Sequence, residues 1–130
     1  MGKIERFEDI LAWQKARYLV NEICDAIESN AKFRRDYRLN DQIIRASFSI
    51  MLNIAEGFGR RTNREFIHFL EVAHGSCCEI ESALYISLDR KYMDKNKFKL
   101  LYDLCDEISK MIMGLIKYLK GYKEEVPQKL

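Results

Sequence analysis

Six arginines on either side of residues 39–58 are the side chains whose type best suits the binding of phosphate. Three precede that segment and three follow it: Arg34, Arg35, Arg38, Arg60, Arg61 and Arg64. A guanidinium group offers a planar fork of N–H donors that matches two oxygens of one phosphate. The two groups therefore indicate contacts to the backbone of RNA or DNA, and ordinary solvated charge is the alternative interpretation.

The distance between the two groups follows from the segment that separates them. A helix over residues 39–58 would hold them about 30 Å apart, because each residue adds about 1.5 Å along the axis. Within one chain they are therefore two separate patches. In a cyclic oligomer each patch would repeat around a ring, and repetition turns weak phosphate contacts into useful avidity.

A further set of polar side chains recurs at steps of three and four residues along the same segment. The set, called the polar stripe here, consists of Gln42, Arg45, Ser49, Asn53, Glu56 and Arg60. This spacing places all six on one face of a helix, with Arg45 four residues before Ser49 and Glu56 four before Arg60 as pairs that support a helix. Three interpretations stay open: a face against another subunit or a neighbouring helix, a solvated face, or a ligand site.

No arrangement of residues indicates catalysis, a metal or a cofactor. His74, Cys77 and Cys78 lie close together, but zinc needs four ligands with paired spacing such as Cys-x-x-Cys, which is lacking in this sequence. His68 and His74 are six residues apart and so face different sides of a helix. The sequence has no Gly-rich phosphate loop, nucleophile elbow or His-Glu-x-x-His. We therefore expect a protein that is not an enzyme.

Helices must position these side chains. The chain has 130 residues, of which 48% are hydrophobic and 32% charged, as expected of one globular domain over residues 1–130. One proline and six glycines are too few for the many turns of a β-sandwich or barrel. Apolar residues recur with a helical period in four segments: 8–29, 39–58, 62–90 and 94–120. Short connections between them predict an all-α, antiparallel up-down four-helix bundle, followed by a polar tail over 122–130.

Local signals mark where the helices begin and end. Thr62 opens a capping box with Glu65 at the start of the third helix, and Asp94 is expected to cap the fourth. Residues 30–38 are polar and basic, so they are expected to form a loop or a frayed first turn. The basic arginines that precede the second helix thus fall in a connection.

Four glycines have specific expected roles. Gly57 and Gly59 are expected to end the second helix, and Gly121 the fourth. Gly75 lies in the middle of the third helix, where glycine costs about 1 kcal/mol relative to alanine. It marks either a close helix–helix contact or a glycine that is merely tolerated.

The second helix has the broadest apolar face. Its central row is expected to be Ile44, Phe48, Met51, Ala55 and Phe58. A second row widens the face: Ile43, Ser47, Ile50 and Ile54. Both rows follow helical steps, and the pattern predicts that they meet the core.

The charge and the cysteines bear on partners and location. The net charge of +2 is too small to require a nucleic-acid partner by itself, because phosphate binding needs clustered charge. The chain has four cysteines and no apolar run of about 20 residues, and its first residues lead into an acidic stretch without the apolar segment expected of a secretory signal. We expect a cytoplasmic protein with reduced, mostly buried thiols and no membrane contact.

Several stretches together resemble one known family. These are Phe7–Ala16, Gln42–Ile50, Asn53–Gly57, Phe66–Leu70 and Ala73–Ser76. They resemble the patterns "F-x-x-L-x-x-W-Q-K-A", "Q-I-x-R-A-x-x-S-I-x-x-N-I-A-E-G" and the third-helix pattern of the four-helix bundle proteins encoded in 23S rRNA intervening sequences. Met51-Leu52 departs from the family's common Pro-Ser, which removes a helix kink.

The resemblance implies a bacterial, non-enzymatic bundle that assembles as a ring-shaped homopentamer. The family is similar in fold to the accessory variability determinant of diversity-generating retroelements, a basic pentamer that binds nucleic acid and partners a reverse transcriptase. Two hypotheses follow. The protein is an oligomer that binds nucleic acid, structured RNA above all, through its arginines, or it is a structural or protein-interaction oligomer without nucleic-acid binding of its own, such as a reverse transcriptase accessory.

Overall fold

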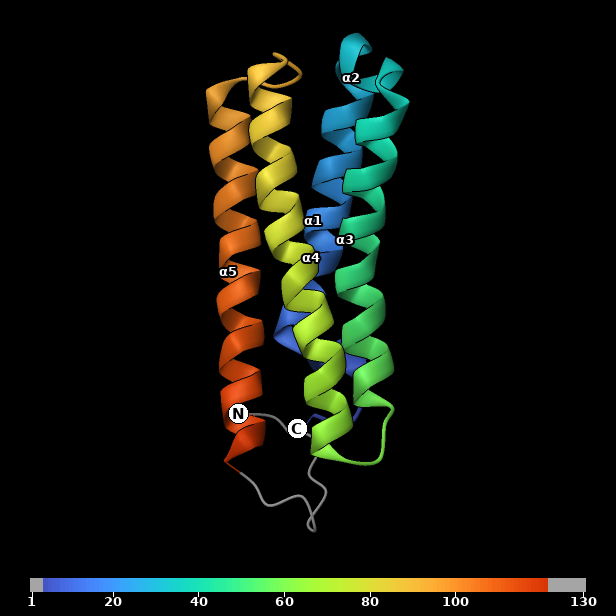
Figure 1. The fold of residues 1–130 in the computed structure, drawn as a ribbon, viewed down its shortest axis with the longest axis vertical. Coiled ribbons are helices and arrows are strands. Elements are labelled where there is room, and N and C mark those ends of the chain that lie inside the picture. Colours follow the sequence, from blue (N-terminus) through green and yellow to red (C-terminus); the bar gives the residue numbers. More distant parts are fainter. Residues whose placement is uncertain (1–3, 122–130) are drawn as a thin grey trace.

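A computed structural model describes residues 4–121, in which four long helices pack as an antiparallel, all-α bundle (Figure 1). The long helices are α1 (Leu11–Glu28), α3 (Tyr37–Phe58), α4 (Asn63–Asp89) and α5 (Lys95–Lys120). A 3₁₀ turn, η1 (Phe7–Asp9), precedes α1, and a short helix, α2 (Ala31–Arg35), lies between α1 and α3. The predicted fold class is confirmed, and the predicted polar tail over 122–130 lies outside the described residues.

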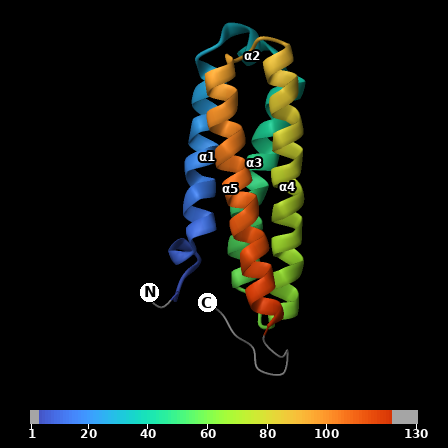
Figure 2. The same cartoon turned by 90° about the vertical axis from the view of Figure 1, so that its left-hand side faces the viewer.

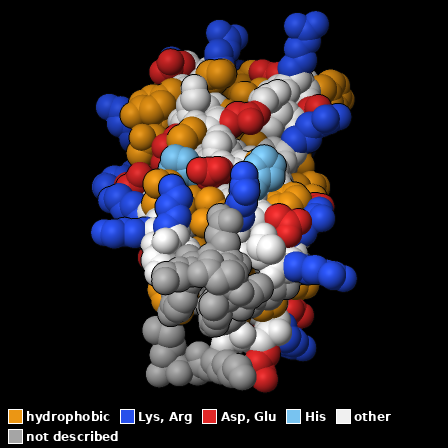
Figure 3. Space-filling model, turned by 60° about the horizontal axis from the view of Figure 1, so that its bottom comes forward, with side chains coloured by type: hydrophobic (Ala, Val, Ile, Leu, Met, Phe, Trp, Pro, Cys, Tyr) orange, Lys and Arg blue, Asp and Glu red, His pale blue; other side chains and the backbone are white. Residues whose placement is uncertain are grey.

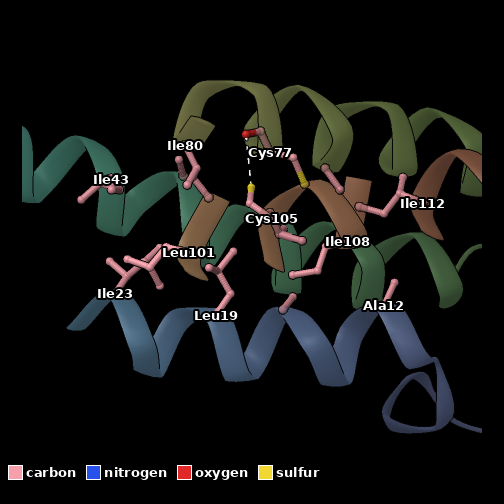
Figure 4. Close-up of a cluster of buried hydrophobic side chains, with 14 of the residues drawn as sticks. Ala12, Leu19, Ile23, Ile43, Cys77, Ile80, Leu101, Cys105, Ile108 and Ile112 are labelled. Carbon is pink, nitrogen blue, oxygen red and sulfur yellow. Dashed lines mark hydrogen bonds between the residues drawn. The ribbon is translucent and has the colours of Figure 1, made fainter. Parts of the chain in front are cut away.

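The helices surround one core. Helix α3 packs against α1 and α4, and α5 packs against α4 and α1, so each long helix has two long neighbours. Figure 4 shows side chains from all four helices meeting along the axis, among them Leu19, Ile43, Ile80 and Ile108. Between residues 4 and 121, no helix has the length and apolarity needed to cross a membrane.

The buried face of α3 differs from the expected one by a rotation about the helix axis. Ile43, Ile50 and Ile54 are at most 1% exposed and form its centre. The expected central row instead lies at the edge of the core, and Phe48 is 45% exposed. Both rows are apolar and adjacent on the helix, so periodicity alone does not locate the centre between them.

The N-caps predicted at Thr62 and Asp94 are confirmed, but in place of the second bond of the capping box the Glu65 carboxylate accepts from the Thr62 hydroxyl at 3.1 Å. The Thr62 hydroxyl accepts a hydrogen bond of 3.1 Å from the Glu65 amide. The Asp94 carboxylate accepts one of 2.8 Å from the Lys97 amide. Gly121 follows the last residue of α5, as predicted. Local sequence determines where these two helices begin, because an N-cap side chain accepts its hydrogen bond from an amide in the first turn of the same helix.

Glycine assignments in α3 and α4 need a correction. Helix α3, the second of the four predicted helices, ends at Phe58 with Gly59 as its C-cap, while Gly57 is a buried residue within α3. A Cβ atom at Gly57 would lie 2.7 Å from Cβ of Phe69 and 2.9 Å from Cδ1 of Phe66, so the close contact between α3 and α4 occurs here. A Cβ at Gly75 would meet nothing within 4 Å. Gly75 is therefore the tolerated glycine, and no helix within the described chain approaches it closely.

Candidate nucleic-acid interface

The two groups of arginines lie at opposite ends of the bundle. Arg34 and Arg35 belong to α2, and Arg38 is the second residue of α3, at the end where α4 also connects to α5 (Figures 1 and 2). Arg60 and Arg61 lie in the connection from α3 to α4, at the other end. Within one chain the two groups therefore form separate patches, as the sequence predicted.

Residues 30–38, expected as a loop or a frayed first turn, fold into α2 and the first turn of α3. The Asn30 side chain caps α2 by accepting from the Phe33 amide at 2.9 Å, and Asp36 caps α3 by accepting from the Leu39 amide at 3.1 Å. Asparagine and aspartate at these two positions are common N-caps. Two caps six residues apart break the connection into two helical pieces that turn the chain across the end of the bundle.

Phe33 anchors this connection to the rest of the protein. It is fully buried and is the only buried residue of α2. Its ring stacks on Tyr92, from the α4–α5 connection, with centroids 5.1 Å apart and an interplanar angle of 18°. The Tyr92 hydroxyl donates a hydrogen bond of 2.8 Å to the Asp36 carboxylate. One tyrosine therefore joins α2, α3 and the α4–α5 connection.

An open cavity of about 710 Å³ lies where these three segments meet. Its lining comprises Lys32, Arg35, Asp36, Tyr37, Arg38, Arg90 and Tyr92. We refer to it as the basic pocket. It brings together two of the predicted arginines, Arg35 and Arg38, with two cations that sequence reasoning missed, Lys32 and Arg90.

The basic pocket has an excess of positive charge that its own residues do not neutralise. None of its four cations forms an ion pair within residues 4–121. Its single carboxylate, Asp36, accepts hydrogen bonds from the Leu39 amide and the Tyr92 hydroxyl. These bonds, the one from Leu39 above all, hold the pKa of Asp36 below its ordinary value. The charges of Arg90 and Arg38 also lower this pKa, so the pocket presents four cations around one ionised carboxylate and keeps an excess of positive charge.

The backbone of the α4–α5 connection places Arg90 and Tyr92 at the basic pocket. Helix α4 ends at Asp89, and Lys91 adopts a left-handed conformation with φ of 63°. The Tyr92 amide then donates to the Ser87 carbonyl at 2.8 Å, which closes the turn. No motif marks Arg90 and Tyr92 as partners of Arg35, because their proximity depends on how α4 packs against α3. The left-handed lysine leaves no sequence signal either.

Arg34 faces a different direction from its two neighbours. Its guanidinium donates a hydrogen bond to the Glu28 carbonyl in the last turn of α1. A cation at this position interacts favourably with the negative, C-terminal end of the α1 helix dipole. Arg34 does not line the basic pocket, so the structure separates it from Arg35 and Arg38.

At the opposite end, the second arginine group is divided as well. Arg60 pairs with Glu56 at 2.8 Å, as the spacing suggested, and its guanidinium lies 4.7 Å from the ring centre of Phe69. Arg61 and Arg64 are exposed. Figure 3 shows basic side chains spread among acidic ones around this end of the bundle. Among the described residues, this group thus has one cation with a carboxylate partner and two that are exposed.

Two of the six polar-stripe residues, Gln42 and Ser49, form side-chain hydrogen bonds to α4. The Gln42 amide donates to the Glu79 carboxylate, and the Ser76 hydroxyl donates to Ser49 at 2.8 Å. Asn53 donates to the Ser49 carbonyl at 2.8 Å. Helix α4 therefore supplies hydrogen-bond partners for Gln42 and Ser49, whereas Asn53 bonds within α3 and Glu56 and Arg60 pair with each other.

Arg45 is the exception in the polar stripe. Its side chain is 78% exposed and pairs with Asp41 at 3.0 Å, one turn earlier, in place of the expected Ser49. A carboxylate attracts the guanidinium more strongly than a hydroxyl does. Arg45 therefore points to solvent in one chain.

The cysteines belong to the core more than to any site. Within residues 4–121, no group of histidine, cysteine and acidic side chains could hold a metal ion. Cys77 and Cys105 are fully buried, and the Cys105 thiol donates to the Cys77 carbonyl at 3.4 Å (Figure 4). The hydrogen bond to Cys77 and, as a smaller cause, burial raise the pKa of the Cys105 thiol. Cys24 is half-buried, and Cys78 is exposed, which corrects the expectation of mostly buried thiols for that residue.

Thiol labelling should therefore follow a fixed order in the native protein. Cys78 should react first because it is exposed, and Cys24 more slowly because burial raises its pKa. Cys77 and Cys105 should react only when the protein unfolds. Timed alkylation followed by peptide mass spectrometry measures all four rates. Labelling of Cys105 as fast as that of Cys78 would contradict the packing described.

Comparisons with known proteins agree with this fold. The chain is similar to a protein of unknown function from the S23 ribosomal protein family of Bacteroides thetaiotaomicron, with 21% identity and a TM-score of 0.76. The similarity covers 82% of this chain and 99% of that one. No curated protein matches the chain significantly. The 23S rRNA-intervening sequence protein family matches residues 8–114, which include α1 to α4 and most of α5. The chain therefore belongs to the 23S rRNA-intervening sequence protein family.

Proposed function

We propose that this protein is a non-enzymatic bundle that binds nucleic acid, RNA in particular, through contacts to phosphate in the basic pocket. The observation that carries the proposal is the set of four cations that line one open cavity without an ion-pair partner among residues 4–121. Elsewhere several cations already have carboxylate partners, including Lys15, Arg45, Lys99 and Lys110. A phosphate would supply the missing anion, with guanidinium groups as bidentate donors.

Assembly as a homopentameric ring is part of this proposal. Each pocket offers only a few phosphate contacts, so one copy would bind weakly. Several copies around a ring would present several pockets to one RNA and raise the avidity without new contacts. Arg61 and Arg64 at the other end would add a second, weaker ring of positive charge. The family's name refers to ribosomal RNA, which makes structured RNA the first nucleic acid to test.

Neutralising the basic pocket should weaken RNA binding and flatten its salt dependence. The variant carries Lys32→Gln, Arg35→Gln, Arg38→Gln and Arg90→Gln. On single strands each phosphate that a cation neutralises adds about 0.7 to the slope of log affinity against log salt. Removing four such cations therefore predicts a slope shallower by about 3 for each pocket that contacts the RNA. Fluorescence anisotropy with a labelled RNA over a range of salt concentrations measures the slope.

The matched control removes four cations that already have carboxylate partners. It carries Arg6→Gln, Lys15→Gln, Lys99→Gln and Lys110→Gln, and so changes the net charge equally. We expect this control to keep most of the salt slope. A third variant, with Arg60, Arg61 and Arg64 replaced by glutamine, measures the share of the other end. Equal weakening by the pocket variant and the control would refute a specific phosphate site.

A structural or protein-interaction oligomer is the second candidate function, and the outer side of α3 favours it. Phe48 and Leu52 are 45% and 65% exposed and lie one turn apart. Ile44 and Met51, beside them, are only partly buried. Contiguous exposed apolar side chains of this kind are typical of protein interfaces.

The Phe48→Ser, Leu52→Ser double variant should lower the mass seen by light scattering if this face joins copies. An unchanged mass with weaker binding of a protein partner, such as a reverse transcriptase, would favour an accessory role.

A further inference from the structure

Tyr37 is an exposed aromatic residue at the edge of the basic pocket. Its exposed fraction, 78%, is the largest of the exposed large apolar side chains within residues 4–121. It makes no ring contact or hydrogen bond with the described part of the chain. Phe33 and Tyr92, two other aromatic residues at this end, are both buried. The core therefore does not account for an aromatic ring at position 37.

Tyr37 also stands between two hollows. It lines the basic pocket together with Arg38, and the same two residues line a neighbouring hollow of about 580 Å³. The second hollow is completed by Asn40, Asp41 and Ile44 on the next turns of α3. A chain molecule lying across Tyr37 would thus have cations on one side and a mixed polar and apolar surface on the other. Nucleotides have this division, with a charged phosphate and a flat, largely apolar base.

We propose that Tyr37 stacks on an unpaired base of single-stranded RNA while the basic pocket holds an adjacent phosphate. This inference rests on the proposed function and names the form of nucleic acid that the same site binds. Aromatic side chains stack on bases without regard to sequence, because every base has a π face. A regular duplex offers no such face, because its bases are stacked inside, and proteins contact it through its backbone and groove edges. The pocket without Tyr37 would not distinguish the two forms.

The fixed position of the backbone supports stacking by Tyr37. The residue is the first of α3, directly after the N-cap Asp36, whose carboxylate is bonded to Leu39 and Tyr92. The backbone that carries the ring is therefore held at both sides of the pocket. Preorganisation of this kind lowers the entropic cost of binding a ligand.

The test compares Tyr37→Ala and Tyr37→Phe on a single-stranded RNA and on a perfect duplex of the same length. Tyr37→Ala should weaken binding of the single strand about tenfold and leave the salt slope unchanged, because stacking releases no counterions. Tyr37→Phe should bind like the natural protein. Affinity for the duplex should stay the same in both variants. A single strand with abasic nucleotides should bind the natural protein as weakly as Tyr37→Ala binds the normal strand.

The outcomes separate this inference from the proposed function. If neutralising the basic pocket weakens binding but Tyr37→Ala does not, the stacking inference is overturned and the phosphate site stands. Equal weakening of single strand and duplex by Tyr37→Ala overturns it too. If the pocket variant binds both RNA forms as well as the natural protein does, the proposed function fails, whatever Tyr37 does. Thermal melting by circular dichroism shows that each variant is folded, which is expected because the Tyr37 side chain is exposed.

Discussion

Replacing Phe33 by alanine should lower the free energy of unfolding by about 3–5 kcal/mol, the usual cost of removing a buried phenylalanine. Phe33 is fully buried, stacks on Tyr92 and is the only buried residue of α2. Its removal leaves a cavity that the five residues of α2 cannot close without moving. Urea denaturation followed by circular dichroism measures the change.

Tyr37→Ala is the matched control for Phe33→Ala. Both variants remove an aromatic ring at the same end of the bundle, but Tyr37 is 78% exposed. Exposed substitutions of this kind usually change stability by no more than about 0.5 kcal/mol. A cost below about 1 kcal/mol for Phe33→Ala would mean that α2 detaches while the four long helices stay folded. RNA binding should weaken in that case as well, because α2 carries Lys32 and Arg35 of the basic pocket.

Replacing Gly57 by alanine should destabilise the bundle by about 1–3 kcal/mol, as overpacking of a well-packed core does. The new Cβ atom would lie 2.7 Å from Cβ of Phe69 and 2.9 Å from Cδ1 of Phe66. The first of these atoms is fixed to the α4 backbone, so α3 and α4 would have to move apart. The gain in helix propensity, about 1 kcal/mol, offsets only part of that cost.

Gly75→Ala is the control, and its effect should have the opposite sign. Gly75 lies in the middle of α4 with nothing within 4 Å of an added Cβ, so alanine should stabilise the protein by about 1 kcal/mol. Gly114→Ala in α5 should behave in the same way, because an added Cβ there also meets nothing within 4 Å. Thermal and urea unfolding of the three variants give the comparison. Destabilisation by Gly75→Ala, together with a lower mass in solution, would show that a second copy covers this face of α4.

The features that the sequence determined by itself are those that depend on neighbouring residues along the chain. Helical periodicity indicated four long helices, and the caps at Thr62 and Asp94 confirmed where two of them begin. A cap and an apolar period need only residues within a few turns, so they can be recognised before any tertiary contact is known. The absence of a catalytic motif and the resemblance to the family also depended on short, local patterns. The match over residues 8–114 then showed the family.

Other features were decided only by how the helices pack. Arg90 and Tyr92 join Arg35 in one pocket because α4 and α5 connect at the end where α2 crosses, and no spacing in the sequence links them. The centre of the α3 core face and the close contact at Gly57 depend on where α4 lies. A side chain's burial and its charged neighbours are properties of the space around it, and separate helices create that space. The sequence therefore identified the arginines as candidates. Only the tertiary structure placed Arg35 and Arg38 in the pocket, Arg34 at the end of α1 and Arg60 in an ion pair with Glu56.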